Sequence, residues 1–181
     1  RHAGTSVEVP GDYACGLRGI GGGGPPTTRK VEAGDLYIFD LFPTVEGYRC
    51  DLCRTFSVSA PTALQQAAWE HVVEAHRIAQ RVIRPGVEGR AVYREIRLHL
   101  ERFEAARGSF NHHAGHGVGL DAWEDPWLIP GSDQVIQEGD VVAVEPGLYA
   151  EALGGGIRLV HNYLVGRDGI TALDRFPLEL R

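Results

Sequence analysis

Hydrophobic and polar positions divide the chain into strand-like segments, two helical segments and a second strand-like group. Residues 36–58 are apolar and β-branched around a central Glu46-Gly47 turn, which is typical of two paired strands. Residues 62–83 and 88–106 carry apolar positions three or four apart, which predicts two helices. The last third predicts strands at 134–136, 141–145, 157–165 and 170–173. Strands, then helices, then strands indicate an α+β fold.

The two predicted helices have one apolar face each, so we expect them to cover a sheet rather than to carry chemistry. Pro61 suits the opening turn of the first helix, and Pro85-Gly86 stops it. Three histidines lie on these helices, and we interpret each as a surface or packing residue rather than a metal ligand: His71, His76 and His99.

Residues 1–34 are expected to be rich in loops. The run Gly21 to Pro26 can neither hold a helix nor pair as a central strand, so it is interpreted as a flexible loop. A phosphate-binding loop would need a preceding strand, a following helix and a Lys-Ser/Thr pair, and the sequence here has none of these.

Composition and charge narrow the classes of protein. With 181 residues, of which 43% are hydrophobic, we expect a single domain over residues 1–181. The net charge is −6 and no basic cluster is longer than Arg29-Lys30, which argues against nucleic-acid binding. Three cysteines and no apolar run of about 18 residues favour the cytoplasm and no membrane span. The sequence contains no Met and begins at Arg1, so we expect truncation at the N-terminus.

Cys50 and Cys53 form a CxxC pair within an alternating apolar stretch. A zinc or redox site would need a second Cys or His pair nearby, so two ordinary strand cysteines are the favoured interpretation.

Four acidic or imidazole side chains suggest a hydrolytic metal site. Asp40 ends the apolar run Leu36 to Phe39, where a carboxylate needs a partner charge or a metal to offset its desolvation. Asp51 follows eleven residues later; either aspartate alone could also cap a turn or pair with Arg54.

A histidine cluster and a third acid strengthen the metal hypothesis. The segment from Phe110 to Leu120 contains three histidines among glycines, which permit close backbone approach. Glu145 ends another apolar run, where the alternative is an edge residue facing water. Carboxylates and imidazoles presented from strands are the ligands that hydrolytic divalent ions use.

These motifs together resemble the Xaa-Pro aminopeptidase, prolidase and methionine aminopeptidase family, the M24 "pita-bread" metallopeptidases, over residues 30–181. The matching motifs are Gly34-Asp35-Leu36 through Asp40, Gly47-Tyr48 with Asp51 and Arg54-Thr55-Phe56, Gly115-His116-Gly117-Val118-Gly119-Leu120, Glu145-Pro146-Gly147-Leu148-Tyr149, and Gly156-Ile157-Arg158-Leu159. The resemblance implies a curved antiparallel sheet covered by helices. The string Glu145 to Tyr149 is closer to the proline-directed members.

The resemblance also implies roles for individual residues. Asp40, Asp51, His116 and Glu145 would be metal ligands, with Asp51 bridging two ions. Glu145 and His112 would be catalytic, and His112, Trp123 and Arg158 would bind substrate. The expected cofactor is Mn, Co or Zn, and the expected partner is a short peptide with proline after the cleaved bond; whether the protein forms a homodimer stays open.

Three departures from the family pattern sit at functional positions. Val160 stands where the family has a bridging glutamate, and His161 is a poor substitute because its side chain in a strand would point to the opposite face. Trp123 replaces a histidine, and the upstream pocket histidine falls in Gly24-Pro25-Pro26. With only one bridging carboxylate the repulsion between two ions is poorly offset, so we expect at most one tightly held metal.

The leading hypothesis is therefore an Xaa-Pro peptidase-like metallohydrolase with a degraded dinuclear site. An alternative is a catalytically inactive module of the same fold that binds a peptide or protein partner; the acidic charge argues against a nucleic-acid partner. A third hypothesis, metal-free hydrolysis of the creatinase kind, needs the upstream histidine that the sequence lacks.

Overall fold

Two helices and a set of antiparallel strands make up the protein in the computed structural model, which describes residues 6–178 and 180. The helices are α1 (Ala63–Val82) and α2 (Gly89–Leu100). Short 3₁₀ turns occur elsewhere in the chain. The strands are β1 (Val7–Glu8), β2 (Gly11–Cys15), β3 (Leu36–Leu41), β4 (Thr44–Val45), β5 (Tyr48–Arg49), β6 (Leu52–Ser57), β7 (Gly115–Gly117), β8 (Glu124–Leu128), β9 (Val141–Val144), β10 (Gly147–Ala150), β11 (Gly155–Arg158), β12 (His161–Gly166) and β13 (Gly169–Ala172).

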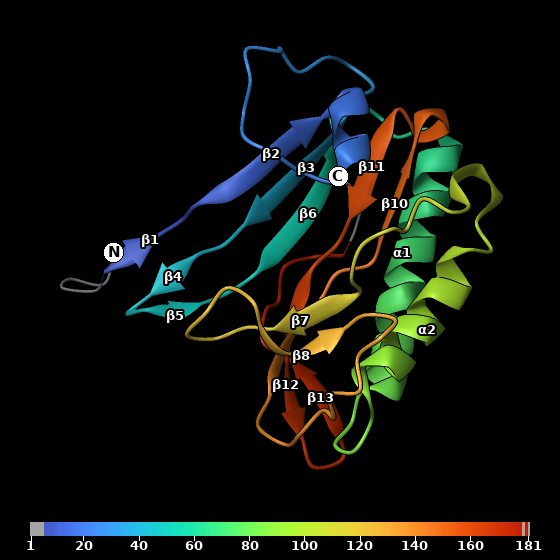
Figure 1. The fold of residues 1–181 in the computed structure, drawn as a ribbon. Coiled ribbons are helices and arrows are strands. Elements are labelled where there is room, and N and C mark those ends of the chain that lie inside the picture. The colour runs from blue at the N-terminus through green and yellow to red at the C-terminus, as the bar shows by residue number, and fades with distance from the viewer. Residues whose placement is uncertain (1–5, 179, 181) are drawn as a thin grey trace.

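The strands form two main antiparallel sheets linked by a hairpin. One sheet has the order β2-β3-β6, the other has the order β13-β12-β9-β7-β8, and the β10-β11 hairpin lies between them against β3 and β6. Both helices pack together on one side of this arrangement (Figure 1). The α+β prediction is confirmed. Neither helix among the described residues is long and apolar enough to span a bilayer.

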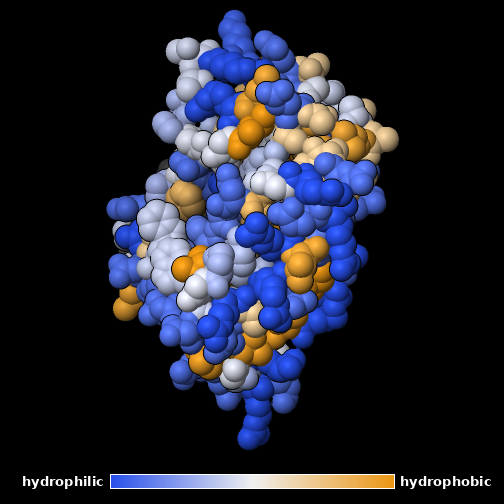
Figure 2. Space-filling model, turned by 45° about the vertical axis from the view of Figure 1, so that its right-hand side comes forward, coloured by the Kyte–Doolittle hydropathy of each residue, from blue (hydrophilic) through white to orange (hydrophobic). Residues whose placement is uncertain are grey.

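The first helix forms almost where its pattern predicts. The hydroxyl of Thr62 accepts a hydrogen bond from the amide of Gln65, and the Gln65 side chain accepts one from the amide of Thr62. This capping box satisfies two donors that the first turn leaves free. The apolar face of α1, including Trp69 and Val72, is buried in the main core. The face of the molecule in Figure 2 is mostly hydrophilic, with several separate hydrophobic patches.

The second helix ends earlier than predicted. It stops at Leu100 rather than 106, and only a 3₁₀ turn occupies Glu104–Ala106. The amides of Arg102 and Phe103 bond to carbonyls three residues back, which tightens the end of the helix. Phe103 then leaves the helical conformation and packs against the core.

Three strand predictions need correction. Residues 11–15, expected as loop, form β2 because their backbone pairs along the whole of β3. The segment 134–136 is not a strand, since only Val135 makes an isolated bridge with Glu88. The segment 157–165 is two strands in different sheets, β11 and β12, interrupted at Leu159-Val160.

The turn predicted at Glu46-Gly47 is confirmed and joins β4 to β5. Both residues have positive φ, 53° for Glu46 and 84° for Gly47, the conformation of a hairpin turn that matches strand twist. This small hairpin lies between β3 and β6 in sequence, so Asp40 is in β3 whereas Asp51 immediately precedes β6.

Candidate metal centre

Three predicted ligands meet in the interior of the protein. His116 lies in β7, Glu145 follows β9, and Asp51 precedes β6. The Nε2 atom of His116 is 3.4 Å from Oδ2 of Asp51 and 3.2 Å from Oε1 of Glu145. All three residues are buried, and their ligand atoms lie within 4.8 Å of one another. At this spacing the three side chains could hold a metal ion together.

Glycines beside His116 let the strands approach this closely. A Cβ on Gly115 would collide with the backbone carbonyl of Ala143, and a Cβ on Gly117 would collide with that of Asp125. Strand β7 can therefore lie between β8 and β9 only with glycine at both positions. The backbone of His116, which these two glycines flank, is therefore held close to Glu145.

The orientation of the His116 ring is set by a backbone contact. Its Nδ1 is 2.8 Å from the carbonyl oxygen of Gly117, which can only accept, so Nδ1 carries the hydrogen and Nε2 faces the carboxylates. Metal-binding histidines ordinarily donate their second ring N–H in this way. Burial lowers the pKa of His116, but the contacts with Asp51 and Glu145 outweigh burial and raise it to about 10.

The charge balance of the centre favours a cation. Burial raises the pKa of Asp40 to about 7, with the charges of Asp51 and Glu145 adding to the effect and Arg158 opposing it. Burial likewise raises the pKa of Asp51. Burial also acts on Glu145, but its contacts with His113 and His116 outweigh burial and lower its pKa to about 2. The buried carboxylates are thus stabilised by nearby imidazoles and by Arg158, and a metal ion would be a further positive partner.

Several buried atoms of this centre lack a hydrogen-bond partner among the described residues. They are Asp40 Oδ1, Asp51 Oδ1, His113 Nδ1, His116 Nε2 and Glu145 Oε1. Buried polar atoms are almost always satisfied, so a cluster of unpaired oxygens and nitrogens calls for an explanation. Carboxylate and imidazole atoms at these distances fit a divalent transition metal.

Asp40 is placed differently from the other predicted ligands. Its carboxylate contacts the guanidinium of Arg158, and it belongs to neither group of three ligand atoms found among the described residues. Arg158, predicted to bind substrate, is thus partly committed to an ion pair. Both side chains are buried, so the pair is well shielded from water.

Val160 is fully buried in an apolar cluster with Ile38, Cys53, Val118, Ala143 and Tyr149. Its side chain offers no ligand atom. His161 points elsewhere, with Nδ1 2.7 Å from Asp174 Oδ1, so it does not replace a ligand at this position.

The predicted substrate residues lie in two separate cavities that border the centre. His112 and Arg158 line a cavity of 200 Å³ together with Glu145 and Tyr149. Trp123, which is 62% exposed, lines a cavity of 120 Å³ that includes Asp51. One cavity therefore reaches Glu145, and the other reaches Asp51.

His112 is held at both ring nitrogens. Nδ1 lies 2.7 Å from the carbonyl oxygen of His113, and Nε2 lies 2.9 Å from the hydroxyl of Tyr149. Burial lowers the pKa of His112 to about 4, so the ring is neutral near pH 7. His113, to which the sequence assigned no role, places Nδ1 3.0 Å from Oε1 of Glu145. Its adjacency to His112 in a motif rich in histidine was the only signal for it.

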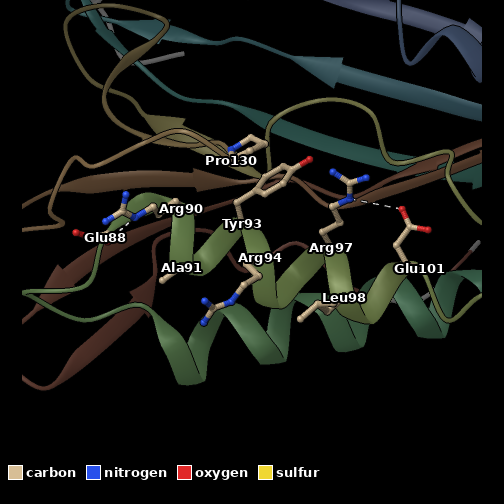
Figure 3. A pocket seen from close by; sticks show the side chains of 9 residues that line it. All are labelled: Glu88, Arg90, Ala91, Tyr93, Arg94, Arg97, Leu98, Glu101 and Pro130. Atoms are coloured by element: carbon tan, nitrogen blue, oxygen red, sulfur yellow. Dashed lines mark hydrogen bonds and ion pairs between the residues drawn. The ribbon is translucent and has the colours of Figure 1, made fainter.

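A larger cavity lies away from these ligands. It measures 370 Å³ and follows α2 between Glu88 and Pro130 (Figure 3). Arg90 and Arg97 on its wall pair with Glu88 and Glu101, at 2.6 and 3.6 Å. Paired, exposed charges on one helix are typical of a solvated surface rather than of a catalytic centre.

The profile of metallopeptidase family M24 matches residues 7–167. The chain belongs to this family. An Xaa-Pro dipeptidase of Pyrococcus horikoshii is 31% identical over 92% of this chain, and a putative dipeptidase, YkvY, of Bacillus subtilis is 34% identical over 87%. These alignments cover 47% and 43% of the two relatives, so the M24 chain spans less than half their length.

Solved structures confirm the pita-bread fold of this M24 chain. The prolidase of Pyrococcus horikoshii superposes with a TM-score of 0.87 at 30% identity, covering 94% of this chain and 49% of that one. The dipeptidase PepE of Mycobacterium ulcerans gives a TM-score of 0.87 at 29% identity, covering 94% and 46%.

Proposed function

We propose that this M24 chain is a peptidase-type metallohydrolase that acts on short peptides with proline after the cleaved bond. The observation that carries the proposal is the convergence of Asp51, His116 and Glu145, whose unpaired ligand atoms lie within 4.8 Å of one another. The names of the relatives, an Xaa-Pro dipeptidase among them, support the substrate class.

One divalent ion, Mn, Co or Zn, would be held tightly by these three side chains. When bound, such an ion polarises a carbonyl and lowers the pKa of a coordinated water from about 15.7 toward about 7. Glu145 also borders the cavity that His112 lines, so a peptide bound in that cavity would lie beside the ion that Glu145 helps to hold. His112 is neutral and its Nε2 accepts from the Tyr149 hydroxyl, and both side chains line the cavity that a peptide substrate would enter.

The proposed site is reduced relative to the two-ion pattern that the sequence resembles. Val160 supplies no ligand, and the indole of Trp123 can donate a hydrogen bond but cannot transfer a proton as an imidazolium does. Loss of such a group typically costs about 10² or more in rate. We therefore expect slow turnover.

The test combines metal analysis with a substrate panel. Protein prepared with Mn, Co or Zn should retain at least one ion per chain after dialysis, and should cleave Xaa-Pro dipeptides faster than Xaa-Ala dipeptides. Asp51→Asn should lose both properties, whereas Asp133→Asn, at an exposed aspartate, should lose neither. Protein without bound metal and without turnover would contradict the proposal.

A second candidate function is peptide binding without hydrolysis. The apolar packing of Val160 favours it, because a buried cluster that accommodates valine this well does not require a metal-bridging carboxylate. Calorimetry separates the two functions, since a pure binding module would bind an Xaa-Pro peptide with no product formed in the same sample.

A further inference from the structure

A second group of metal-ligating side chains adjoins the first. The ligand atoms of His112, His113 and Glu145 lie within 4.8 Å of one another. Oε1 of Glu145 is 3.0 Å from Nδ1 of His113 and 3.2 Å from Nε2 of His116. Glu145 is therefore the one residue that both groups share.

The Nδ1 atom of His113 faces Glu145 without a hydrogen bond. Its Nδ1 is buried and has no hydrogen-bond partner among the described residues, although Glu145 is near, because the two groups lack hydrogen-bond geometry. The ring packs at 90° against Trp127, with centroids 5.5 Å apart, and against His116. The imidazole is thus oriented by its neighbours toward a carboxylate that it does not hydrogen-bond.

His112 has the tautomer that a metal ligand requires. Its Nδ1 lies against the carbonyl oxygen of His113 and so carries the hydrogen, which leaves Nε2 unprotonated. His116 is held by a backbone carbonyl in the same manner. Nε2 of His112 contacts the Tyr149 hydroxyl, which an ion would displace, so this ligand position is weaker than that of His116.

There is room for an ion on this side of Glu145. A cavity of 200 Å³ is lined by all three ligand residues. Arg158 also lines it, but its positive charge is paired with Asp40.

We propose that Glu145 is shared by two cation sites, the tight one with Asp51 and His116 and a weaker one with His112 and His113. Two imidazoles and one carboxylate suit Zn²⁺ or Co²⁺ better than Mg²⁺ or Ca²⁺, which prefer all-oxygen ligands. The inference deepens the proposed function and rests on it for the role of Glu145.

Zinc titration of the purified chain by calorimetry tests the second site. Wild type should bind two Zn²⁺ ions with distinct affinities. His113→Gln should retain the tight ion and lower the affinity for the second ion. Loss of a residue that only hydrogen-bonds to a metal ligand typically lowers affinity by about 10- to 100-fold, so loss of a ligand should cost at least that much. His71→Gln, on α1 and bonded to the carbonyl of His99, is the matched control and should bind two.

Cobalt absorption gives a readout independent of activity. Co²⁺ at both sites should produce visible bands, of which His113→Gln removes one component and Asp51→Asn the other. If His113→Gln binds as many ions as wild type, or wild type binds a single ion that only Asp51→Asn removes, the second site is refuted while the proposed function stands. If wild type binds no ion, both proposals fail.

Discussion

The backbone amide of Val160 donates to the carbonyl of Cys53, with nitrogen and oxygen 3.1 Å apart. This bond ties the break between β11 and β12 to β6, the strand that follows Asp51. The side chain of Val160 lies in the apolar cluster with Ile38 and Cys53, at the position where the family pattern has a bridging glutamate.

Val160→Glu should add one divalent ion per chain and destabilise the metal-free protein. An uncompensated buried carboxylate typically costs about 3–5 kcal/mol, and a bound ion offsets that cost. Thermal unfolding with and without Mn²⁺, together with metal analysis, checks both expectations. Val160→Gln has nearly the same shape without the charge and should gain no ion; if both variants bind metal like wild type, position 160 does not face the centre.

Trp123→His should raise turnover of an Xaa-Pro dipeptide by about 10², because an imidazolium can transfer a proton where an indole cannot. Trp123 is 62% exposed, so the replacement should leave the free energy of unfolding within about 0.5 kcal/mol, as is usual for surface sites. The measurement is kcat on a matched substrate series. Trp123→Phe supplies the control, and an equal gain in that variant would show that relief of bulk, not imidazole chemistry, is responsible.

Gly117→Ala should both destabilise the fold and weaken metal binding. The added methyl group meets the carbonyl of Asp125, so β7 must shift and carry His116 with it. We expect a loss of about 1–3 kcal/mol in urea unfolding, typical of overpacking, with a parallel loss of zinc affinity. Gly131→Ala meets no atom within 4 Å and should be close to neutral. If Gly117→Ala is destabilised but binds zinc with unchanged affinity, the close packing of β7 does not determine where His116 lies.

Acid should destabilise the protein through His76, a residue outside the metal centre. Its Nε2 lies 2.9 Å from the carbonyl oxygen of Leu159 and its Nδ1 3.2 Å from the Tyr163 hydroxyl. Burial, reinforced by the charge of His161, lowers the pKa of His76 from 6.5 to about 3. The folded protein therefore binds fewer protons than the unfolded chain, and stability is lost as pH falls from about 6.5 toward 3.

Urea unfolding of wild type and His76→Gln across this pH window measures the effect. The difference in free energy of unfolding should shrink by up to about 1.4 kcal/mol per pH unit below pH 6.5, since one proton is linked to unfolding. Above that pH the difference should be constant. A difference that is the same at pH 7 and pH 5 would mean that His76 is not held neutral in the folded state.

Local interactions explain what could be predicted before the tertiary structure. Helix α1 begins and ends within one residue of the predicted bounds because its cap at Thr62 and its apolar spacing depend only on neighbours along the chain. The Glu46-Gly47 turn depends on its own two residues. The motifs around Asp51, His116 and Glu145 likewise indicated the family and the residues that the structure brings together.

Contacts between segments far apart in the sequence determine the features that local patterns could not predict. Strand β2 has little pattern of its own and forms because β3 offers a complete edge, while 157–165 divides because its two halves pair with different partners. The pairing of Asp40 with Arg158, and the direction of His113 toward Glu145, depend on side-chain orientation across strands far apart in sequence. The sequence by itself determined which chemistry is present. Only the tertiary structure decided which of those groups lie close enough to hold an ion, because that depends on distances between strands that no local pattern encodes.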